Sequence, residues 1–321
     1  GKLKPKFDEF STNWDLLEEY METLYSSMDE DIEIARYNYG YALRTHKSST
    51  DRPLAPSVIK WGSVLLEAAT TFSDTVSIHV SNAYINLGKI SKAIEILQNH
   101  GNPKSARISS KIQGYHDLLD LMNNGTDFDL SHHSETFDPI PGRVLYVLHN
   151  SLPYNSGGYA TRGHGLMCGV KELGWDVQVV TRRGYPHDRT GMQDSPTDSL
   201  QIVEDIPYHR LIELEKGYGQ INIAAYLQLY ADDLAQKVLE LRPSIIHAAS
   251  NHINGLVANA VGKHFSIPSI YEVRGLWEIT RISRQPEFES SEYFQMMSSL
   301  EASSASEADY TFAITHALGK E

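Results

Sequence analysis

The sequence predicts an α/β protein in which an all-helical domain precedes a Rossmann-like parallel sheet. Two observations carry this prediction. Residues before about 125 show only the three-to-four spacing of apolar residues that indicates helices, whereas residues after about 142 alternate short apolar runs with amphipathic stretches. Such alternation is typical of a doubly wound parallel sheet with right-handed crossovers. We therefore expect helices over 1–125, a turn-rich linker over 126–141 and a sheet domain over 142–321.

The N-terminal region contains a series of amphipathic patterns. Because each such helix must bury one apolar face, we expect the helices to pack against one another. The patterns cover residues 14–28, 34–45, 58–69, 76–87, 91–99 and 105–122. The sequence Asn123-Asn124-Gly125 ends the last of them.

One part of this region, Asn82-Ala-Tyr-Ile-Asn-Leu-Gly-Lys-Ile-Ser-Lys-Ala-Ile-Glu95, resembles the central turn of a tetratricopeptide repeat. In that repeat a small residue and a glycine let two antiparallel helices approach closely. The match covers about half of one repeat, and no second copy follows at the period of about 34 residues. An ordinary pair of helices is the alternative. The sharper hypothesis is a short helical array that contacts a protein partner.

The C-terminal region predicts six strands separated by helices. The run Val144–Leu148 is apolar throughout, as in strands that are buried on both faces. The remaining strands are expected at 176–181, 208–211, 244–248, 268–273 and 310–314. Helices are expected at 159–173, over about 20 residues ending at Arg242, at 254–265 and at 290–307.

Composition excludes several classes of protein. The formal net charge of −13 disfavours binding to nucleic acid or to anionic lipid. The single cysteine, Cys168, excludes a disulfide framework and fits a reducing compartment. No apolar run approaches the ~18–20 residues that span a bilayer. No metal site is expected, because His132 and His133 are adjacent, would point apart on a helix or strand, and have no carboxylate or thiolate to complete a set.

Basic residues follow several of the predicted strands. In doubly wound sheets, ligands bind beyond the carboxyl ends of the strands. The residues that the prediction places there are His149, Arg182, Arg183, His247, Arg274 and His316. In a chain as acidic as this one, a basic rim indicates a pocket for an anionic group.

The pair Gly157-Gly158 lies between the first strand and its helix. Two residues without Cβ let the backbone approach a ligand closely, and the following helix points its free N–H groups and positive dipole end at the same place. Arg162, in the first turn of that helix, is unfavourable against the dipole by about 0.3–1 kcal/mol unless an anion lies nearby. The alternatives are that the glycine pair only forms a turn and that Arg162 is an ordinary surface residue. The spacing does not match a dinucleotide fingerprint, which disfavours a nicotinamide dehydrogenase.

These motifs together resemble a known family. They are Asn155–Leu166, Leu173–Val177, Val180–Pro186, Arg242–Ala248, Ile267–Glu278 and Ala308–Thr315. In this order they are similar to the N-terminal, acceptor-side domain of group 1 (family 4) glycosyltransferases of the GT-B fold. The resemblance covers about residues 142–321.

The resemblance implies an enzyme of the hexosyltransferase type. It would transfer a sugar from a nucleotide-sugar, such as a UDP- or GDP-sugar, to a glycan or other acceptor, with retention and without a metal or other cofactor. It further implies a role in cell-surface or exopolysaccharide synthesis and a cytoplasmic location, and it allows peripheral contact with the inner face of the membrane.

The resemblance also assigns site residues. Gly157 and Gly158 inherit a position beside the donor diphosphate, and the other substrate-binding candidates are Tyr159, Arg162, Arg182 and His247. The catalytic candidates are Arg274 and Glu278. Arg274 replaces a histidine common in the family, and an arginine suits an anionic acceptor or a leaving phosphate. Glu278 would orient Arg274 or accept a sugar hydroxyl, unless the two form a plain ion pair. For His247 a structural role is the alternative.

Members of the family carry a second, donor-side domain with a Glu-x7-Glu pattern. This sequence stops inside the helix expected after Ile314. The expectation is therefore a truncated enzyme that is inactive alone, because half a cleft cannot orient both substrates. The alternative function is a non-catalytic binding or scaffold module built from helices and a Rossmann-like sheet.

Overall fold

The computed structural model describes residues 35, 38–43, 55–69, 71–195, 197–212 and 222–320. The helix predicted at 14–28 and part of the one predicted at 34–45 lie outside these residues. The chain divides into two compact units, Gly1–Asn86 with Ser91–Ser109, and Leu87–Ile90 with Ser110–Glu321. No helix in the described part of the chain is both long enough and apolar enough to cross a membrane.

The described residues of the first unit form helices. The main ones are α4 (Ala55–Glu67), α5 (Asp74–Asn86) and α6 (Ile90–His100). Their buried apolar residues include Val58, Leu66, Ile78, Val80 and Leu97. Gly62 permits the close approach of α4 to α5, because a Cβ added there would lie 2.2 Å from the Cγ2 atom of Val80.

The second unit is built on a seven-stranded sheet in the order β3-β4-β2-β1-β5-β6-β7. The strands are β1 (Arg143–Leu148), β2 (Asp176–Thr181), β3 (Leu200–Val203), β4 (Ile206–His209), β5 (Ile245–Ala249), β6 (Ser269–Val273) and β7 (Tyr310–Ala313). All neighbours pair in parallel except β3, which is antiparallel to β4. The predicted Rossmann-like class is therefore confirmed.

The β3–β4 hairpin corrects one detail of the sequence analysis, which expected a single strand at 208–211 between the strands at 176–181 and 244–248. The chain reverses at Glu204 and Asp205, both with positive φ, 47° and 62°. Neither residue is a glycine, so the pattern of residues gave no hairpin signal of the usual kind.

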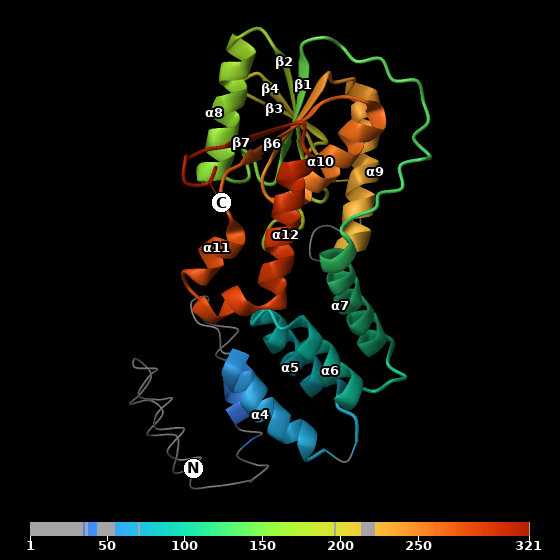
Figure 1. Ribbon diagram of the computed structural model, residues 1–321, viewed down its shortest axis with the longest axis vertical. Coiled ribbons are helices and arrows are strands. Elements are labelled where there is room, and N and C mark those ends of the chain that lie inside the picture. Colours follow the sequence, from blue (N-terminus) through green and yellow to red (C-terminus); the bar gives the residue numbers. More distant parts are fainter. Residues whose placement is uncertain are drawn as a thin grey trace. The chain divides into compact units, whose positions relative to one another are not determined.

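Helices cover both faces of the sheet (Figure 1). Helix α8 (Gly158–Glu172) lies on one face, and α9 (Ile223–Leu241), α10 (His252–Phe265) and α12 (Glu292–Glu307) lie on the other. Two short helices, α11 (Trp277–Ile282) and η1 (Pro286–Ser290), follow β6. Strand β1 is buried on both faces because Leu145 and Val147 pack in the core with α9 and α10, whereas Tyr146 and Leu148 pack in the core with α8.

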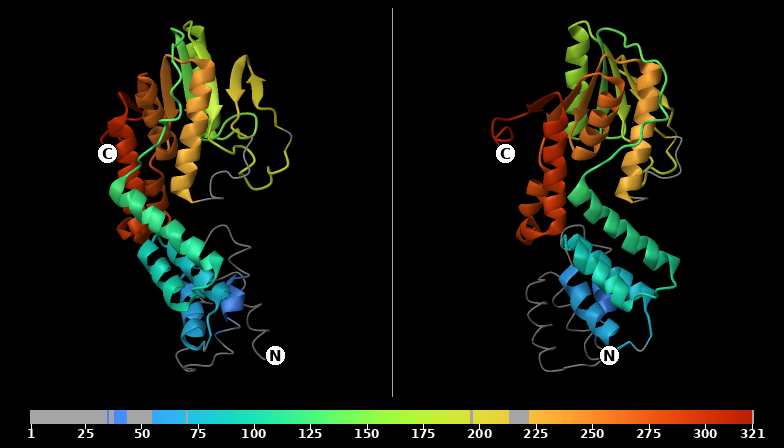
Figure 2. Two further views of the ribbon diagram at one scale, coloured as in Figure 1. Left: turned by 90° about the vertical axis from the view of Figure 1, so that its right-hand side faces the viewer. Right: turned by 45° about the vertical axis from the view of Figure 1, so that its right-hand side comes forward.

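Between α7 (Ala106–Asn124) and β1 the chain forms no helix or strand. This segment is nevertheless packed against the domain, beside α9 (Figure 2). Leu130 is buried in the core. The side-chain amide of Gln228 accepts a hydrogen bond from the N–H of Asp129 (3.1 Å) and donates one to its carbonyl (2.9 Å).

Candidate functional site

The carboxyl ends of β1, β2, β5 and β6 form one rim of the sheet. The parallel register pairs Leu148 with Thr181, and Ala249 with Glu272, so the strands end at a common level. Residues directly after these strands, such as Arg182 and Arg274, therefore lie at the same end of the sheet. This is the end that sequence reasoning selected for ligand binding.

A buried carboxylate, Glu272, organises the part of the rim that lies beneath α8. Its Oε2 atom accepts hydrogen bonds from Arg274 Nη2 (2.8 Å) and from the Tyr146 hydroxyl (2.6 Å), and lies 3.6 Å from His247 Nε2. Its Oε1 atom lies 3.6 Å from Nε of Arg162. The structure thus brings Arg162, His247 and Arg274 together around a residue that the sequence analysis did not single out as a site residue.

Several further contacts hold Arg274. Its Nη1 atom donates to the carbonyl of Tyr159 at the start of α8 (2.9 Å), and its guanidinium also donates to the Tyr146 hydroxyl. Its backbone N–H donates to Ser250 Oγ (3.0 Å). A Cβ added at Gly163 would lie 3.3 Å from Nη1, so a glycine in the middle of α8 makes room for the guanidinium.

Burial and charge set the protonation of this cluster. Burial by itself raises the pKa of Glu272, but the hydrogen bond and charge of Arg274, with the Tyr146 hydroxyl, outweigh it and lower that pKa. Burial raises the pKa of Tyr146 and lowers the pKa of His247 to about 4, against the attraction of Glu272. Near neutral pH the cluster therefore contains one carboxylate and two arginines, and its net positive charge resides on Arg162, whose side chain is 50% exposed.

The loop before α8 leaves the helix N-terminus open. Gly157 is the N-cap residue, and no side chain caps the helix there. The N–H of Gly157 itself is held by Asn155 Oδ1 (2.7 Å), while a Cβ added at Gly158 would meet nothing within 4 Å. Tyr159 packs its hydroxyl over Gly275, where a Cβ would lie 2.7 Å away. Backbone N–H groups and the positive end of α8 therefore face open space beside Arg162.

Arg182 belongs to a separate cluster. It is 4% exposed and donates to Asp188 Oδ1 (2.8 Å), to Asn150 Oδ1 (3.2 Å) and to the carbonyl of His149. Its neighbour Arg183 pairs with Asp233 of α9. This differs from the expectation of a basic rim open to an anion, because Arg182, Arg183 and Arg274 are each neutralised by a carboxylate of the protein. The sequence analysis also expected an anion beside Arg162, and the carboxylate of Glu272 lies there, 3.6 Å from Nε of Arg162.

A further arginine, Arg210, was missed by sequence reasoning. It is 2% exposed, and it donates to Ser151 Oγ (2.5 Å), to the carbonyl of Leu152 (2.6 Å) and to Gln201 Oε1 (3.1 Å). The rings of Tyr154, Tyr185 and Tyr208 surround its guanidinium. Burial lowers the pKa of Arg210 to about 10, which still leaves it charged at neutral pH. Arg210 fixes the start of the loop that leads to Gly157. Its partners there lie more than 50 positions away in the sequence, so no local pattern pointed to Arg210.

Glu278 was expected to orient Arg274, to accept a sugar hydroxyl or to form an ion pair with Arg274. It is 4% exposed and forms no ion pair with Arg274, whose carboxylate partner is Glu272. Burial, with the nearby charge of Glu301, raises the pKa of Glu278. Because consecutive residues of a strand point to opposite faces, Tyr271 binds Glu301 of α12 on the face opposite Glu272. Glu278 therefore belongs to the cluster around Glu301, and its predicted role in orienting Arg274 is not supported by the geometry.

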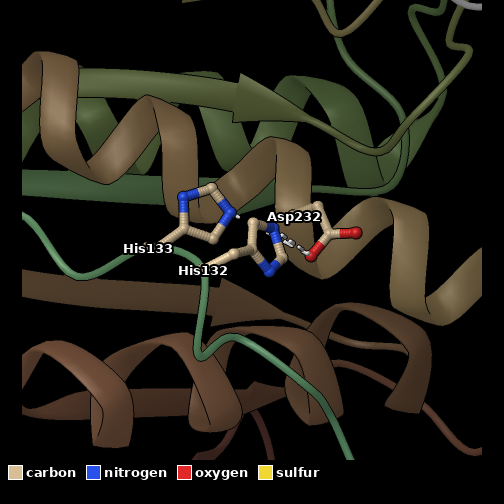
Figure 3. A group of neighbouring side chains, drawn as sticks. All are labelled: His132, His133 and Asp232. Atoms are coloured by element: carbon tan, nitrogen blue, oxygen red, sulfur yellow. Dashed lines mark ion pairs between the residues drawn. The ribbon is translucent and has the colours of Figure 1, made fainter.

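The expectation that His132 and His133 point apart is wrong. They lie in a turn of the segment before β1, and a turn does not impose the alternation of a strand. Their ring centroids are 4.2 Å apart, and both side chains approach the carboxylate of Asp232 on α9 (Figure 3).

Comparison with models of known protein families identifies a family for this chain. A model of the glycosyl transferase 4-like domain matches residues 157–321, from the N-cap of α8 through β7. No curated protein matches the chain. The match covers just over half of the chain and includes α8, Glu272 and Arg274. The chain therefore belongs to the family of glycosyltransferases that contain this 4-like domain.

Proposed function

We propose that this protein transfers a sugar from a nucleotide-sugar to an acceptor bound at the carboxyl rim of β1, β5 and β6. Membership of the glycosyltransferase family supports the reaction class. The observation that carries the site is the Glu272–Arg274 cluster beneath the open N-terminus of α8. As the family resemblance implies, the donor is a UDP- or GDP-sugar, transfer retains the anomeric configuration, and no metal cofactor takes part.

The proposed roles of the residues follow from their exposure. Arg162, half exposed and carrying the net charge of the cluster, meets the donor diphosphate together with the amides of Gly158 and Tyr159. Arg274 is 4% exposed and binds the carbonyl of Tyr159, so its burial favours a positioning role: it fixes the first turn of α8 against the sheet. His247, neutral above a pKa of about 4, packs edge-on against the Tyr146 ring and supports the same cluster.

The wider setting rests on the resemblance. We propose that a donor-side domain completes the cleft, so that residues 1–321 alone transfer sugar far more slowly than the complete enzyme. The enzyme would act in the cytoplasm, including at the inner face of the membrane, in the synthesis of a cell-surface polysaccharide. The helical region, including the tetratricopeptide-like turn between α5 and α6, would bind a protein partner.

The experiment is a screen of UDP- and GDP-sugars with the complete enzyme, followed by nuclear magnetic resonance analysis of the product. We expect release of a nucleoside diphosphate with one donor and a product of unchanged anomeric configuration. Arg162→Ala should raise the KM for the donor, and Arg274→Ala should lower kcat by about tenfold or more, since it displaces the first turn of α8. If no donor is consumed while a protein partner binds, the scaffold function is the correct one.

A further inference from the structure

Outside the rim, two groups of side chains bring three metal-ligating atoms within 4.8 Å of one another in the described part of the chain. One consists of His132, His133 and Asp232. The other consists of His164, Cys168 and Glu204. Histidine nitrogen, cysteine sulfur and carboxylate oxygen are the ligands that zinc prefers in proteins. The two groups differ in their buried histidine: His164 has partners at both ring nitrogens, whereas Nε2 of His133 has no hydrogen-bond partner, although Asp232 Oδ1 already accepts from Gln228 Nε2 (3.0 Å).

The second group is satisfied without an ion. Nδ1 of His164 bonds to the Tyr208 hydroxyl (2.7 Å), and its Nε2 bonds to Glu204 Oε2 (3.1 Å). Both ring nitrogens are therefore in use. Burial raises the pKa of Cys168, which opposes the thiolate that a metal needs.

The first group contains an unsatisfied nitrogen. His133 is 9% exposed, and its Nε2 atom has no hydrogen-bond partner. This nitrogen lies 4.0 Å from Asp232 Oδ1, which is too far for a hydrogen bond, and Nε2 of His132 lies 3.4 Å from the same oxygen. Figure 3 shows the two rings converging on the carboxylate. Zinc bonds of about 2.0–2.1 Å at tetrahedral angles place ligand atoms about 3.3 Å apart, close to these separations.

The surroundings hold the three residues in place. The Asp129 backbone is bound on both sides by Gln228, one turn before Asp232 on α9. The N–H of His133 donates to the carbonyl of Leu130 (2.9 Å), and the carbonyl of His133 bonds to Nε2 of His264 (2.7 Å). When ligand side chains are already held in position, little conformational entropy is lost as the ion binds.

We propose that His132, His133 and Asp232 bind one Zn²⁺ ion, with water as the fourth ligand, and that the ion fastens the segment before β1 to α9. The His132 side chain is 57% exposed and Asp232 28% exposed, which gives the ion a path from solvent and room for the water. The site is separate from the rim and does not depend on the proposed sugar transfer.

The test uses the full chain after treatment with a chelator. Zn²⁺ is titrated in a calorimeter, and Co²⁺ is added in parallel because its visible spectrum reports tetrahedral coordination. We expect one ion per chain and a higher Tm with Zn²⁺. His132→Gln should weaken binding by about tenfold or more; since that side chain is exposed, folding is not threatened. Asp232→Asn should act in the same direction.

The matched control is His116→Gln, an exposed histidine of α7, which should leave the affinity unchanged. Equal affinity in the wild type and in His132→Gln would overturn the proposal, as would the absence of binding. A sulfur-to-cobalt band that Cys168→Ser abolishes would overturn it too, because the ion would then lie at His164.

Discussion

Two buried carboxylates on opposite faces of β6 are satisfied in different ways. Glu272, beneath α8, is paired with Arg274 and lies within reach of Arg162, which leads to the surface. Glu301, on α12, accepts from the Tyr271 hydroxyl and from the backbone N–H of His252 (2.9 Å). The exposures of the two are nearly equal, 5% and 6%. Burial alone therefore does not distinguish the two carboxylates; Glu272 differs in lying 3.6 Å from Arg162, a half-exposed cation.

The largest expected effect comes from Glu272→Gln. This change leaves Arg274 as a buried cation without its carboxylate, so the free energy of unfolding should fall by about 3–5 kcal/mol. The measurement is the urea midpoint at pH 7. A double variant, Glu272→Gln with Arg274→Met, serves as the control, because removing both charges should recover much of the loss. A single variant as stable as the wild type would show that the pair is not energetically important.

The next effect is a pH dependence that belongs to the Glu272 cluster. The pKa of His247 is about 4 in the folded protein and 6.5 ordinarily. The contribution of its neutral ring to the free energy of unfolding is therefore fully present above pH 6.5 and is lost as the pH falls towards 4. That contribution is on the order of 3 kcal/mol. His247→Gln should therefore flatten the slope of unfolding free energy between pH 4 and 6.5. The remaining slope should include His209, whose pKa burial likewise lowers to about 4. An unchanged slope in His247→Gln would contradict this assignment.

The matched change on the other face, Glu301→Gln, should cost less. The amide oxygen can still accept hydrogen bonds, and no arginine pairs with Glu301 among the described residues. We expect a loss of about 1–3 kcal/mol in the same urea experiment. A loss as large as that of Glu272→Gln would remove the distinction between the two carboxylates.

The smallest effect on stability is expected for Arg162→Ala. The side chain is half exposed and its contact with Glu272 is long, 3.6 Å, so the free energy of unfolding should change by less than about 1 kcal/mol. Donor affinity in the complete enzyme should nevertheless fall, and Arg162→Lys should keep part of it. If Arg162→Ala binds the donor normally, the positive charge of the cluster has no role in the substrate site.

Much of the second unit could be predicted from the sequence. The apolar run at Val144–Leu148 indicated a strand buried on both faces, and the alternation of strands and helices indicated the parallel sheet. These features follow from local periodicity. The rim was predictable too, because in a parallel sheet the residues that follow each strand come to one edge.

The contacts within the candidate site were not predictable in the same way. Arg274 was singled out, but its partner Glu272 was not, and Glu278 was expected beside Arg274 although it forms no ion pair with Arg274 and is influenced by the charge of Glu301. The pairing of Arg183 with Asp233 joins residues 50 positions apart. Only the packing of α8 and α9 on the sheet brings such groups together.

Local sequence patterns were enough to predict the class of the sheet, the edge at which its loops gather and the glycine pair before α8. Hydrophobic periodicity and the absence of a Cβ in glycine are properties of a few neighbouring residues, so a single sequence shows them. The tertiary structure alone decided which charges neutralise each other and which cation remains exposed. It also decided that two adjacent histidines face one aspartate. Those outcomes depend on distances of a few ångströms between segments remote in the chain, and no local pattern encodes such distances.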